Sequence, residues 1–541
     1  MAKGYRPVLR EQPFLLPPDM REWLPADHPV WLVIKAVDHL DTSAFHAARR
    51  TGGAGVAGYD PDMLATLLVW AYASGVTSSR RIEAACLADV GFRVICAGDA
   101  PDHVTIARFR AAFPGAAETL FGEVLVLCAK LGMGKLGTVA LDGMKIAANA
   151  SKAANRTEET LRKLAARRAG EHAAADAAED EMFGEGRRGD EVPPDVVNPA
   201  SRDERIRQAL ADLEAERQAA EAAREQQAQE YLAQQGTAAG KPPAAAAVEA
   251  ARARLERARA ARAAQIAELQ RRAAGPVAAG RRRDRPRAGI EDYCLVKAAH
   301  EALEKAGARA ADAERKASQN KGPGPVRNIT DPDSRLMPVR GGGFIQGYNT
   351  QNLTSEDKLI IATELTQDTT DTEWFEPMLA KAEDAAALIT AHQPAPAAST
   401  GTQASGIGQV LADAGYCSGH NLTIAGPDRL IATGKHRDLE KTARQAATGQ
   451  AAAGQDTPKE PIAAMAARLA TPEGIAAYRQ RGHIAETPHG NIKHNMGIRR
   501  LTMRGKPKAA AEWTFTCAVH NLIKAITTGR LTHQALAALA S

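Results

Sequence analysis

Cysteine is scarce in this sequence, and the six cysteines among its 541 residues stand far apart. None belongs to a Cys-x-x-Cys pair, so the sequence indicates neither a structural zinc site nor the disulfide framework of a small secreted domain. We therefore expect reduced thiols, as in the cytosol. The six positions are Cys86, Cys96, Cys128, Cys294, Cys417 and Cys517.

Long apolar runs are also missing. The two longest, residues 64–76 and 120–133, are shorter than the roughly 20 residues that a bilayer-spanning helix needs, and they include polar or charged residues. The stretch Met1 to Pro7 lacks the apolar core of a signal peptide. We expect a soluble intracellular protein without a membrane partner.

Several cofactor signatures are absent as well. No Walker A sequence is present, and the glycines at 341–343 form a turn rather than a dinucleotide fingerprint. The histidines His483, His489 and His494 have neither cysteine partners nor a His-Glu-x-x-His pattern, which disfavours zinc. We expect no nucleotide cofactor.

Length and charge set wider bounds. A chain of 541 residues is long enough for two or three domains. Its 69 basic and 64 acidic side chains nearly balance, leaving a net charge of +5. Any surface that binds nucleic acid must therefore come from local clustering of basic residues.

Residues 1–135 are expected to form a helical N-terminal domain. Short helices are predicted after Asp60-Pro61, after residues 77–79 and after Pro101-Asp102, and the third carries Arg108 and Arg110. Three short helices with basic residues suit a helix-turn-helix-like DNA-binding unit, whose third helix enters a major groove. An ordinary helical bundle with solvated arginines fits the same pattern, and both readings stay open.

Residues 136–155 contain the first predicted strand. Thr138, Val139 and Leu141 favour a strand that delivers Asp142 to its end, and Gly143 then lets the backbone turn. A single aspartate of this kind is more often a cap or a salt-bridge partner, so its role depends on companions elsewhere in the chain.

Residues 156–325 differ sharply in composition and are rich in Ala, Arg, Glu and Gln. Apolar residues recur near helical spacing, which predicts long charged helices and is compatible with a helical hairpin. The run from Arg281 to Arg287 carries five arginines and could neutralise several phosphates. A merely solvated face is the alternative.

Residues 326–434 return to strand-like alternation. Strands are predicted at 343–352, 358–365, 409–413 and 429–433, with a helix at 372–389. This order indicates a mixed-sheet α/β fold whose first strand holds Asp142. A polar loop insertion is expected at 435–465, and helices in 466–541 complete the core.

Two carboxylates, Asp142 and Asp413, would lie side by side if their strands are neighbours, and a helix could bring Glu486 over them. Such an all-oxygen cluster suits Mg²⁺ or Mn²⁺. Two ions about 3.5–4 Å apart can activate a hydroxyl and stabilise the leaving oxygen in phosphodiester chemistry. Glycosidases also use paired carboxylates, but they do not require basic residues near the third acid.

Basic residues follow Glu486 closely. Lys493 lies seven residues further on and shares its helix face if the helix is continuous, while Arg499, Arg500 and Arg504 come next. These cations could hold a DNA strand. Pro488 must either lie in a first helical turn or kink this helix.

The sequence resembles the DDE transposases of bacterial insertion sequences, most closely the insertion-sequence eleven-eighty-two branch. The matching blocks span nearly the whole chain in the expected order. They are residues 101–110, 141–151, 188–193, 328–337, 346–351, 413–416, 485–490 and 512–522.

The resemblance implies an RNase H-like core that a long helical insertion interrupts after its first strand. It implies that Asp142, Asp413 and Glu486 form the catalytic metal-binding triad. Plausible counterparts of a tyrosine, an arginine and a lysine that flank the glutamate in related enzymes are Tyr478, Arg481 and Lys493. Met144 departs from the pattern, because a small polar residue is expected there.

The leading hypothesis is a transposase that binds its terminal inverted repeats, cuts at the element ends and joins the freed 3′-hydroxyls to target DNA. Its partners would be double-stranded DNA and further copies of itself, as a homodimer or a larger synaptic complex, in the bacterial cytoplasm at the nucleoid. A transposase-derived DNA-binding or scaffolding protein, and a nuclease without strand transfer, remain as alternatives.

Overall fold

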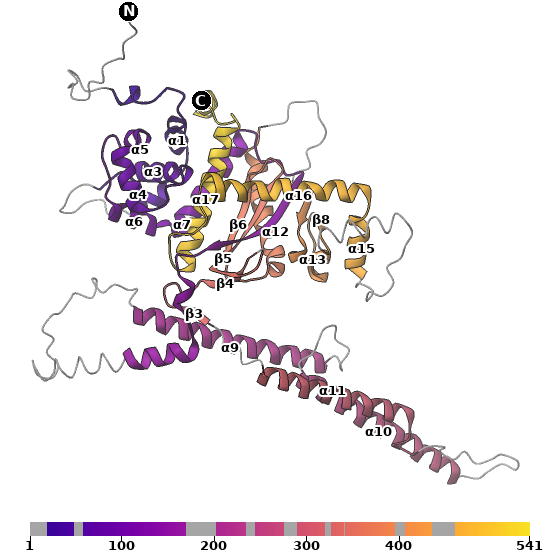
Figure 1. Cartoon of the computed structure of the whole chain (residues 1–541). Coiled ribbons are helices and arrows are strands. Elements are labelled where there is room, and N and C mark those ends of the chain that lie inside the picture. Colours follow the sequence, from indigo (N-terminus) through magenta and orange to yellow (C-terminus); the bar gives the residue numbers. More distant parts are fainter. Residues whose placement is uncertain are drawn as a thin grey trace, which may run out of the picture. The chain divides into compact units, whose positions relative to one another are not determined.

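The computed structural model describes residues 19–47, 58–168, 202–233, 244–274, 289–319, 326–339, 341–394, 406–434 and 460–540. The chain forms two compact units, labelled by element in Figure 1. The first comprises Met1–Ala154 and Thr330–Ser541, and the second Asn155–Ile329. Most of the predicted polar insertion at 435–465 lies outside the described residues, and the other predicted domain boundaries stay predictions.

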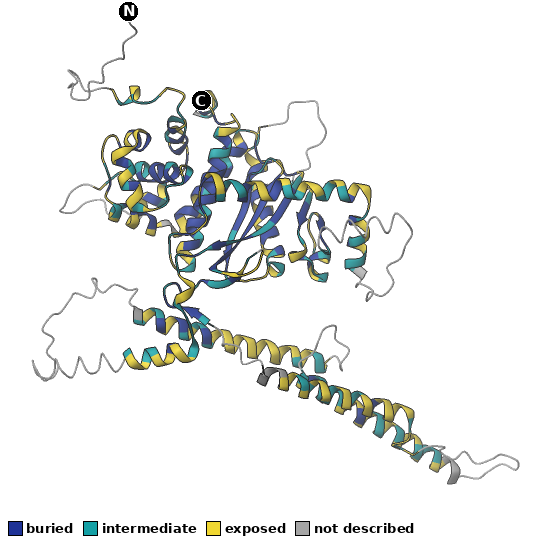
Figure 2. Cartoon of the chain, viewed as in Figure 1, coloured by how far each residue is buried: buried dark blue, intermediate teal, exposed yellow. Residues whose placement is uncertain are grey.

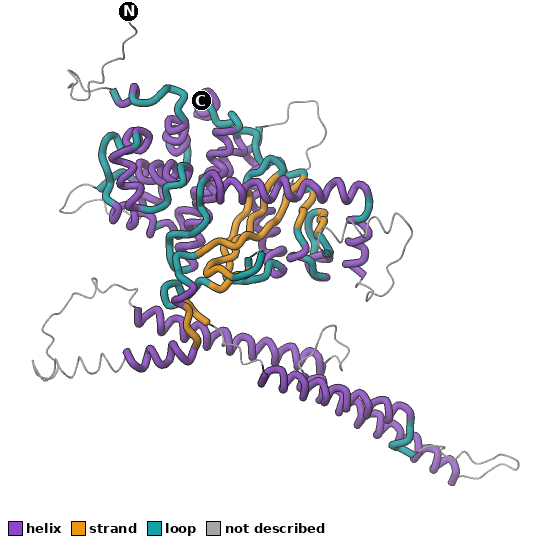
Figure 3. Tube along the Cα trace, in the orientation of Figure 1, coloured by secondary structure: helices purple, strands orange, loops and turns teal. Residues whose placement is uncertain are grey.

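A six-stranded mixed sheet forms the centre of the first unit (Figure 3). Its middle strand pairs antiparallel on one side and parallel on the other, and this confirms the predicted mixed-sheet α/β class. The strands are β4 (Arg335–Pro338) and β6 (Ile360–Thr366), which both pair antiparallel with β5 (Phe344–Ser355), then β1 (Thr138–Ala147), β7 (Gln409–Ala412) and β8 (Asp428–Ile431).

The strand β1 extends further than the sequence predicts. It passes through Asp142 and continues to Ala147, because every residue from Val139 to Ala147 pairs with β5. The expected turn at Gly143 is therefore wrong. Glycine is needed at position 143 for a different reason: a Cβ there would lie 2.6 Å from an oxygen of Asp371, which is too close.

Side chains alternate between the two faces of a sheet. Each face of this sheet therefore packs against its own set of helices. Val139 and Leu141 pack into a large cluster with α7, α12 and α17, whereas Ala140 packs into a smaller one with α15 and α16. Figure 2 shows the centre of the sheet buried between these layers, with half-buried residues along β1 and β4. The helices are α7 (Phe113–Lys130), α12 (Phe375–His392), α15 (Glu460–Leu469), α16 (Pro472–Gly490) and α17 (Lys506–Thr527).

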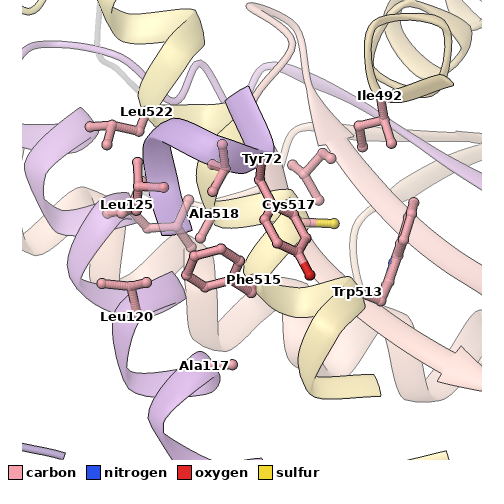
Figure 4. Close-up of a cluster of buried hydrophobic side chains, with 14 of the residues drawn as sticks. Tyr72, Ala117, Leu120, Leu125, Ile492, Trp513, Phe515, Cys517, Ala518 and Leu522 are labelled. Atoms are coloured by element: carbon pink, nitrogen blue, oxygen red, sulfur yellow. The ribbon is translucent and has the colours of Figure 1, made fainter. Parts of the chain in front are cut away.

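The N-terminal helices belong to the same compact unit as the sheet. The predicted start at Asp60-Pro61 is confirmed, since the Asp60 side chain accepts the Asp62 N–H and Pro61 opens the helix. Figure 4 shows Tyr72 of α3 beside Phe515 of α17, with ring centroids 5.1 Å apart and edge to face. The elements are η1 (Met20–Glu22), α1 (Pro29–Val37), α2 (Ser43–Ala47), α3 (Pro61–Ala73), α4 (Ser79–Ala88), α5 (Val90–Ile95) and α6 (His103–Ala111).

A buried ion pair joins these helices to the core. Arg110 of α6 and Glu512 of α17 lie 3.1 Å apart, with side chains only 6% and 1% exposed. Glu512 also accepts the Tyr72 hydroxyl at 2.9 Å and the backbone N–H groups of Thr502 and Met503, each at 2.8 Å. One carboxylate thus holds α3, α6, α17 and the segment before α17 together.

Short elements complete the first unit and connect its main helices. A 3₁₀ turn precedes α12, where a single longer helix was predicted to begin. These elements are η2 (Lys152–Ala154), η3 (Thr372–Trp374), η4 (Ala414–Tyr416), α13 (Gly419–Thr423), the π-helix η5 (Asn491–Asn495) and α18 (His533–Ala540).

The second unit consists mainly of long helices, as its composition predicts. They are α9 (Arg202–Ala233), α10 (Ala244–Ala274) and α11 (Cys294–Gln319), and α10 packs against both of the others. Leu255, Val296 and Ala299 form a small buried cluster between α10 and α11. A two-stranded ladder, β2 (Asn155–Thr157) with β3 (Val326–Asn328), lies within this unit. The arginine run 281–287 lies outside the described residues.

Among the described helices, no single one is long and apolar enough to cross a membrane. Two consecutive helices, His103–Ala111 and Pro114–Lys130, reach the length and apolar composition of a membrane span only when they are taken together, and they are bent by 80° relative to each other.

We predict that Glu512→Ala destabilises the first unit by about 3–5 kcal/mol, because it leaves the buried Arg110 charge without its partner. Urea unfolding followed by tryptophan fluorescence would measure this, since all five tryptophans lie in the first unit. Glu376→Ala is the control, because Glu376 is 60% exposed and should change the free energy of unfolding by less than about 0.5 kcal/mol. Equal midpoints for both variants would refute the structural role of the pair.

Candidate active site

Asp142 and Asp413 lie next to each other at the edge of the parallel part of the sheet. The last parallel pair of β1 and β7 is Leu141 with Ala412, and each aspartate is the next residue along the chain, Asp142 within β1 and Asp413 just after β7. The strand order therefore brings together two carboxylates that are far apart in the sequence. Asp142 also stays paired on its other side with Asn352 of β5, which fixes its backbone.

Arg481 of α16 lies between the two carboxylates. Its Nη2 is 2.7 Å from Asp142 Oδ1 and 3.7 Å from Asp413 Oδ2. The Arg481 and Asp142 side chains are 14% and 15% exposed, whereas that of Asp413 is 42% exposed. The pair of acids therefore shares one cation, and the Asp413 side is open to solvent.

The surroundings shift the pKa values of the two acids in opposite directions. Burial raises the pKa of Asp142, but the hydrogen bond from His489 and the charge of Arg481 outweigh it, so the net pKa is lowered. Burial also raises the pKa of Asp413, and repulsion from Asp142 and Asp371 adds to the rise against the attraction of Arg481. Asp142 is the better stabilised anion.

A chain of hydrogen bonds orients Asp142, and the sequence did not reveal it. Trp513 Nε1 and the Thr363 hydroxyl donate to Asn352 Oδ1, so the Asn352 amide N–H₂ faces His489 Nε2 at 3.0 Å. This contact makes Nε2 an acceptor and leaves the proton on Nδ1, 3.5 Å from Asp142 Oδ2. In the sequence, His489 is weighed only as a zinc ligand, and its place in the matching block 485–490 gives it no role.

Asp371 is a third aspartate beside this pair. Its Oδ1 accepts hydrogen bonds from Asn349 and Gln351, each at 2.7 Å, and lies 3.3 Å from Lys145 Nζ. Added Cβ atoms at Gly143 or Gly415 would come within 2.6 Å and 3.4 Å of its oxygens. In the sequence Asp371 stands just before a predicted helix, where an aspartate indicates only a cap.

The remaining candidates on α16 lie near the pair without completing a triad. Tyr478 packs beside the smaller cluster, and burial followed by the nearby aspartates raises its pKa to about 12 despite Arg481. Glu486 is exposed. Burial lowers the pKa of Arg481, but its acidic neighbours, Asp142 first and Glu486 last, raise it overall. Among the described residues, the one trio of possible metal ligands within 4.8 Å is His46, Asp60 and Asp62. Glu486 is therefore not drawn that close to both aspartates.

The trio of His46, Asp60 and Asp62 has a structural explanation. Asp60 caps α3, while Asp62 Oδ1 accepts from the Thr42 hydroxyl at 2.5 Å and contacts His46 at 2.9 Å. These bonds tie α2 to α3, and we assign the trio no catalytic role.

Lys493 does not share an α-helical face with Glu486. The α-helix ends at Gly490 and continues as the π-helix η5, so the seven-residue spacing argument is wrong. Pro488 lies in the last turns of α16, where it lacks the N–H of the α-helical ladder and a wider turn follows. Lys493 is half-buried; burial and then the charge of Arg499 lower its pKa, against the opposing attraction of Asp142.

The predicted DNA-binding arginines divide into two groups. Arg108, Arg499, Arg500 and Arg504 are exposed and line one groove in the first unit. Arg110 instead points into the protein, where it is bonded to Glu512, to Thr77 O at 2.7 Å and to the Tyr72 hydroxyl at 2.6 Å. Arg110 therefore holds the residues that line the groove in place, while its own side chain is buried beneath them.

Two family models match the chain, one at each end of this unit. The model described as "Transposase domain (DUF772)" matches residues 18–112, which include the helices α1 to α6. The model described as "Transposase DDE domain" matches residues 441–526, which include α16, η5 and α17. The search of curated proteins found no match. The search of solved structures found none either.

These matches define the chain as a protein with transposase domains. Together they support its assignment as a DDE transposase of an insertion sequence, a mobile DNA element. The matched segment 441–526 supplies Arg481, Glu486 and His489, whereas Asp142 and Asp413 come from strands that neither model covers.

We predict that His489→Gln weakens Mn²⁺ binding about 10- to 100-fold, because the partners of a ligating carboxylate fix its orientation. Isothermal titration with Mn²⁺ would measure the affinity. His483→Gln on the same helix is the matched control, since His483 is exposed and should leave the affinity unchanged. If the two variants bind Mn²⁺ equally well, His489 does not position Asp142.

Proposed function

We propose that this protein is a transposase of the insertion-sequence eleven-eighty-two branch. It binds the terminal inverted repeats of its element, cleaves the DNA at the ends and joins the 3′-hydroxyls to target DNA. The observation that carries the proposal is the meeting of Asp142 and Asp413 on adjacent parallel strands, beneath a helix that lies in the matched DDE segment.

The strand order supports an RNase H-like core. Strands β6, β5 and β1 are antiparallel neighbours, and β7 and β8 follow in parallel on the other side of β1. This is the mixed sheet that the resemblance to DDE transposases implies, with its first acid on the central strand. The matched N-terminal helices support a DNA-binding part, and we propose a helix-turn-helix-like role for them.

The carboxylates fit a divalent metal. Asp142 and Asp413 already share a cation, the Arg481 guanidinium, so their oxygens converge on one positive partner. Carboxylate oxygens are the ligands that Mg²⁺ and Mn²⁺ prefer. We propose that Asp142, Asp413 and Glu486 hold two such ions, which supply a hydroxyl nucleophile and stabilise the leaving oxygen at a phosphodiester.

The neighbouring residues have separate roles in this proposal. His489 and Asn352 hold the Asp142 carboxylate in one orientation, and Asp371 pairs with Lys145 of the same strand. Lys493 and Arg499 offer positive charge for the scissile strand, with Tyr478 and Arg481 beside the acids. DNA is the partner of the protein, which acts at the bacterial nucleoid as a homodimer or a larger synaptic complex.

We predict that Asp142→Ala reduces Mg²⁺-dependent cleavage of end-bearing DNA to background while the protein still binds those ends. The carboxylate is needed for metal binding, whereas the basic surface is unchanged by the substitution. Nicking of a labelled duplex with the terminal repeat, beside a gel-shift assay, would separate the two effects. Asp384→Ala is the control, because Asp384 is exposed on α12 and should leave both activities intact.

Three outcomes discriminate between the readings. Strand transfer retained by the Asp142→Ala variant would contradict the assignment of this acid. End binding by the wild type without metal-dependent nicking would instead favour a scaffolding protein. Nicking without joining to a plasmid target would identify a nuclease.

A further inference from the structure

An open groove of about 1120 Å³ lies between the N-terminal helices and the segment that leads into α17. Both walls belong to the first compact unit. One wall is formed by the start of α4 and by α6, and the other by residues 499–504 with Lys508 of α17.

The lining of this groove is strongly basic. Six exposed cations face it, and none of its described lining residues is Asp or Glu. The six are Arg80, Arg108, Arg499, Arg500, Arg504 and Lys508. Such a one-sided concentration of charge differs from the nearly balanced composition of the whole chain, with 69 basic and 64 acidic residues. The groove therefore attracts an extended polyanion.

Buried bonds hold the two walls in place. Arg110 donates to Thr77 O at 2.7 Å and to Ser79 Oγ at 3.3 Å, at the start of α4. The same guanidinium bonds the Thr502 hydroxyl and Glu512 on the opposite wall. The groove thus has a fixed floor, and exposed arginines stand above it on both sides.

The second wall is also attached to the strand that carries Asp142. Leu501 N–H donates to Ala147 O at 2.8 Å, and Asn149 Nδ2 donates to Thr502 O at 2.7 Å. Arg504 Nε donates to the carbonyl of Asn149 at 3.1 Å. Asp142 lies five residues before Ala147 on β1, about 16 Å away at the usual rise per residue.

We propose that this groove holds the sugar-phosphate backbone of duplex DNA without reading its sequence. The inference rests on the proposed function for its choice of DNA as the polyanion. Arginine forks bind phosphate oxygens in pairs, and five of the six cations are arginines. The Ser78 side chain does not cap α4, so the start of this helix adds N–H groups that favour an anion.

The lining favours a duplex over a single strand. None of its described residues is Phe, Tyr or Trp, so it lacks the rings on which unpaired bases stack. Arg108 and His103 of α6 face this groove together with the second wall. In this proposal α6 contacts one DNA backbone from the side, through the residues that it contributes to the groove.

The test is the salt dependence of DNA affinity in the full-length chain carrying Arg80→Gln, Arg108→Gln and Lys508→Gln together. Each lost phosphate contact should lower the slope of log affinity against log salt by about one, so the slope should fall by about three. Fluorescence anisotropy with a short random-sequence duplex, in EDTA, measures binding without cleavage. The slope should fall by the same amount for a duplex that contains the terminal repeat.

The matched control replaces Arg81, Lys130 and Arg530 by Gln, which removes the same charge from exposed positions outside the groove. This variant should keep a slope within about one of the wild type. Equal slopes for the two triple variants would overturn the proposal. So would a loss confined to the terminal-repeat duplex, or a larger loss on the single strand of the same sequence than on the duplex.

Failure of the proposed function looks different. A wild type that binds random duplex with a steep slope but never cuts element ends leaves the groove result intact and contradicts the transposase assignment. A wild type that cuts ends while the groove variant keeps its full slope contradicts the groove alone.

Discussion

The parallel pairing of β1 with β7 is the constraint on which the candidate active site depends. It places Asp142 next to Asp413, although more than half of the intervening chain lies in a separate compact unit. Two carboxylates at this distance repel each other, and Arg481 offsets the repulsion from above. The helix α16 therefore has two roles. Its Ile484 and Ala485 pack in the smaller apolar cluster, and its Arg481 supplies the positive charge between the two acids.

A second contact of comparable weight is the buried pair of Arg110 and Glu512. It connects the N-terminal helices with the segment before α17, and that segment is hydrogen-bonded to the end of β1. Hydrogen bonds thus connect the basic groove with the strand that carries Asp142. A DNA backbone held in the groove would have a fixed relation to the carboxylates without any base-specific contact.

The sequence predicts most of the core strands and the adjacency of Asp142 and Asp413, because strand alternation and family motifs are local properties. It fails where a role depends on a distant partner. Arg110 belongs to a predicted DNA-binding helix, yet it is buried, and its partner Glu512 lies 402 residues further along the chain. His489 and Asp371 lie near the two acids only because the folded chain brings them into contact with β1 and β5, respectively. The π-helix after Pro488 could not be expected from side-chain periodicity, which assumes a regular turn.

The central claim is that divalent metal binds at Asp142 and Asp413, with Glu486 as the third ligand. Iron-directed cleavage tests it most directly: Fe²⁺ replaces Mg²⁺, ascorbate generates hydroxyl radicals at the bound ion, and mass spectrometry locates the breaks in the chain. The account predicts breaks next to residues 142, 413 and 486, which excess Mg²⁺ suppresses. Breaks confined to the region of His46, Asp60 and Asp62, the one close trio of possible ligands among the described residues, would contradict it.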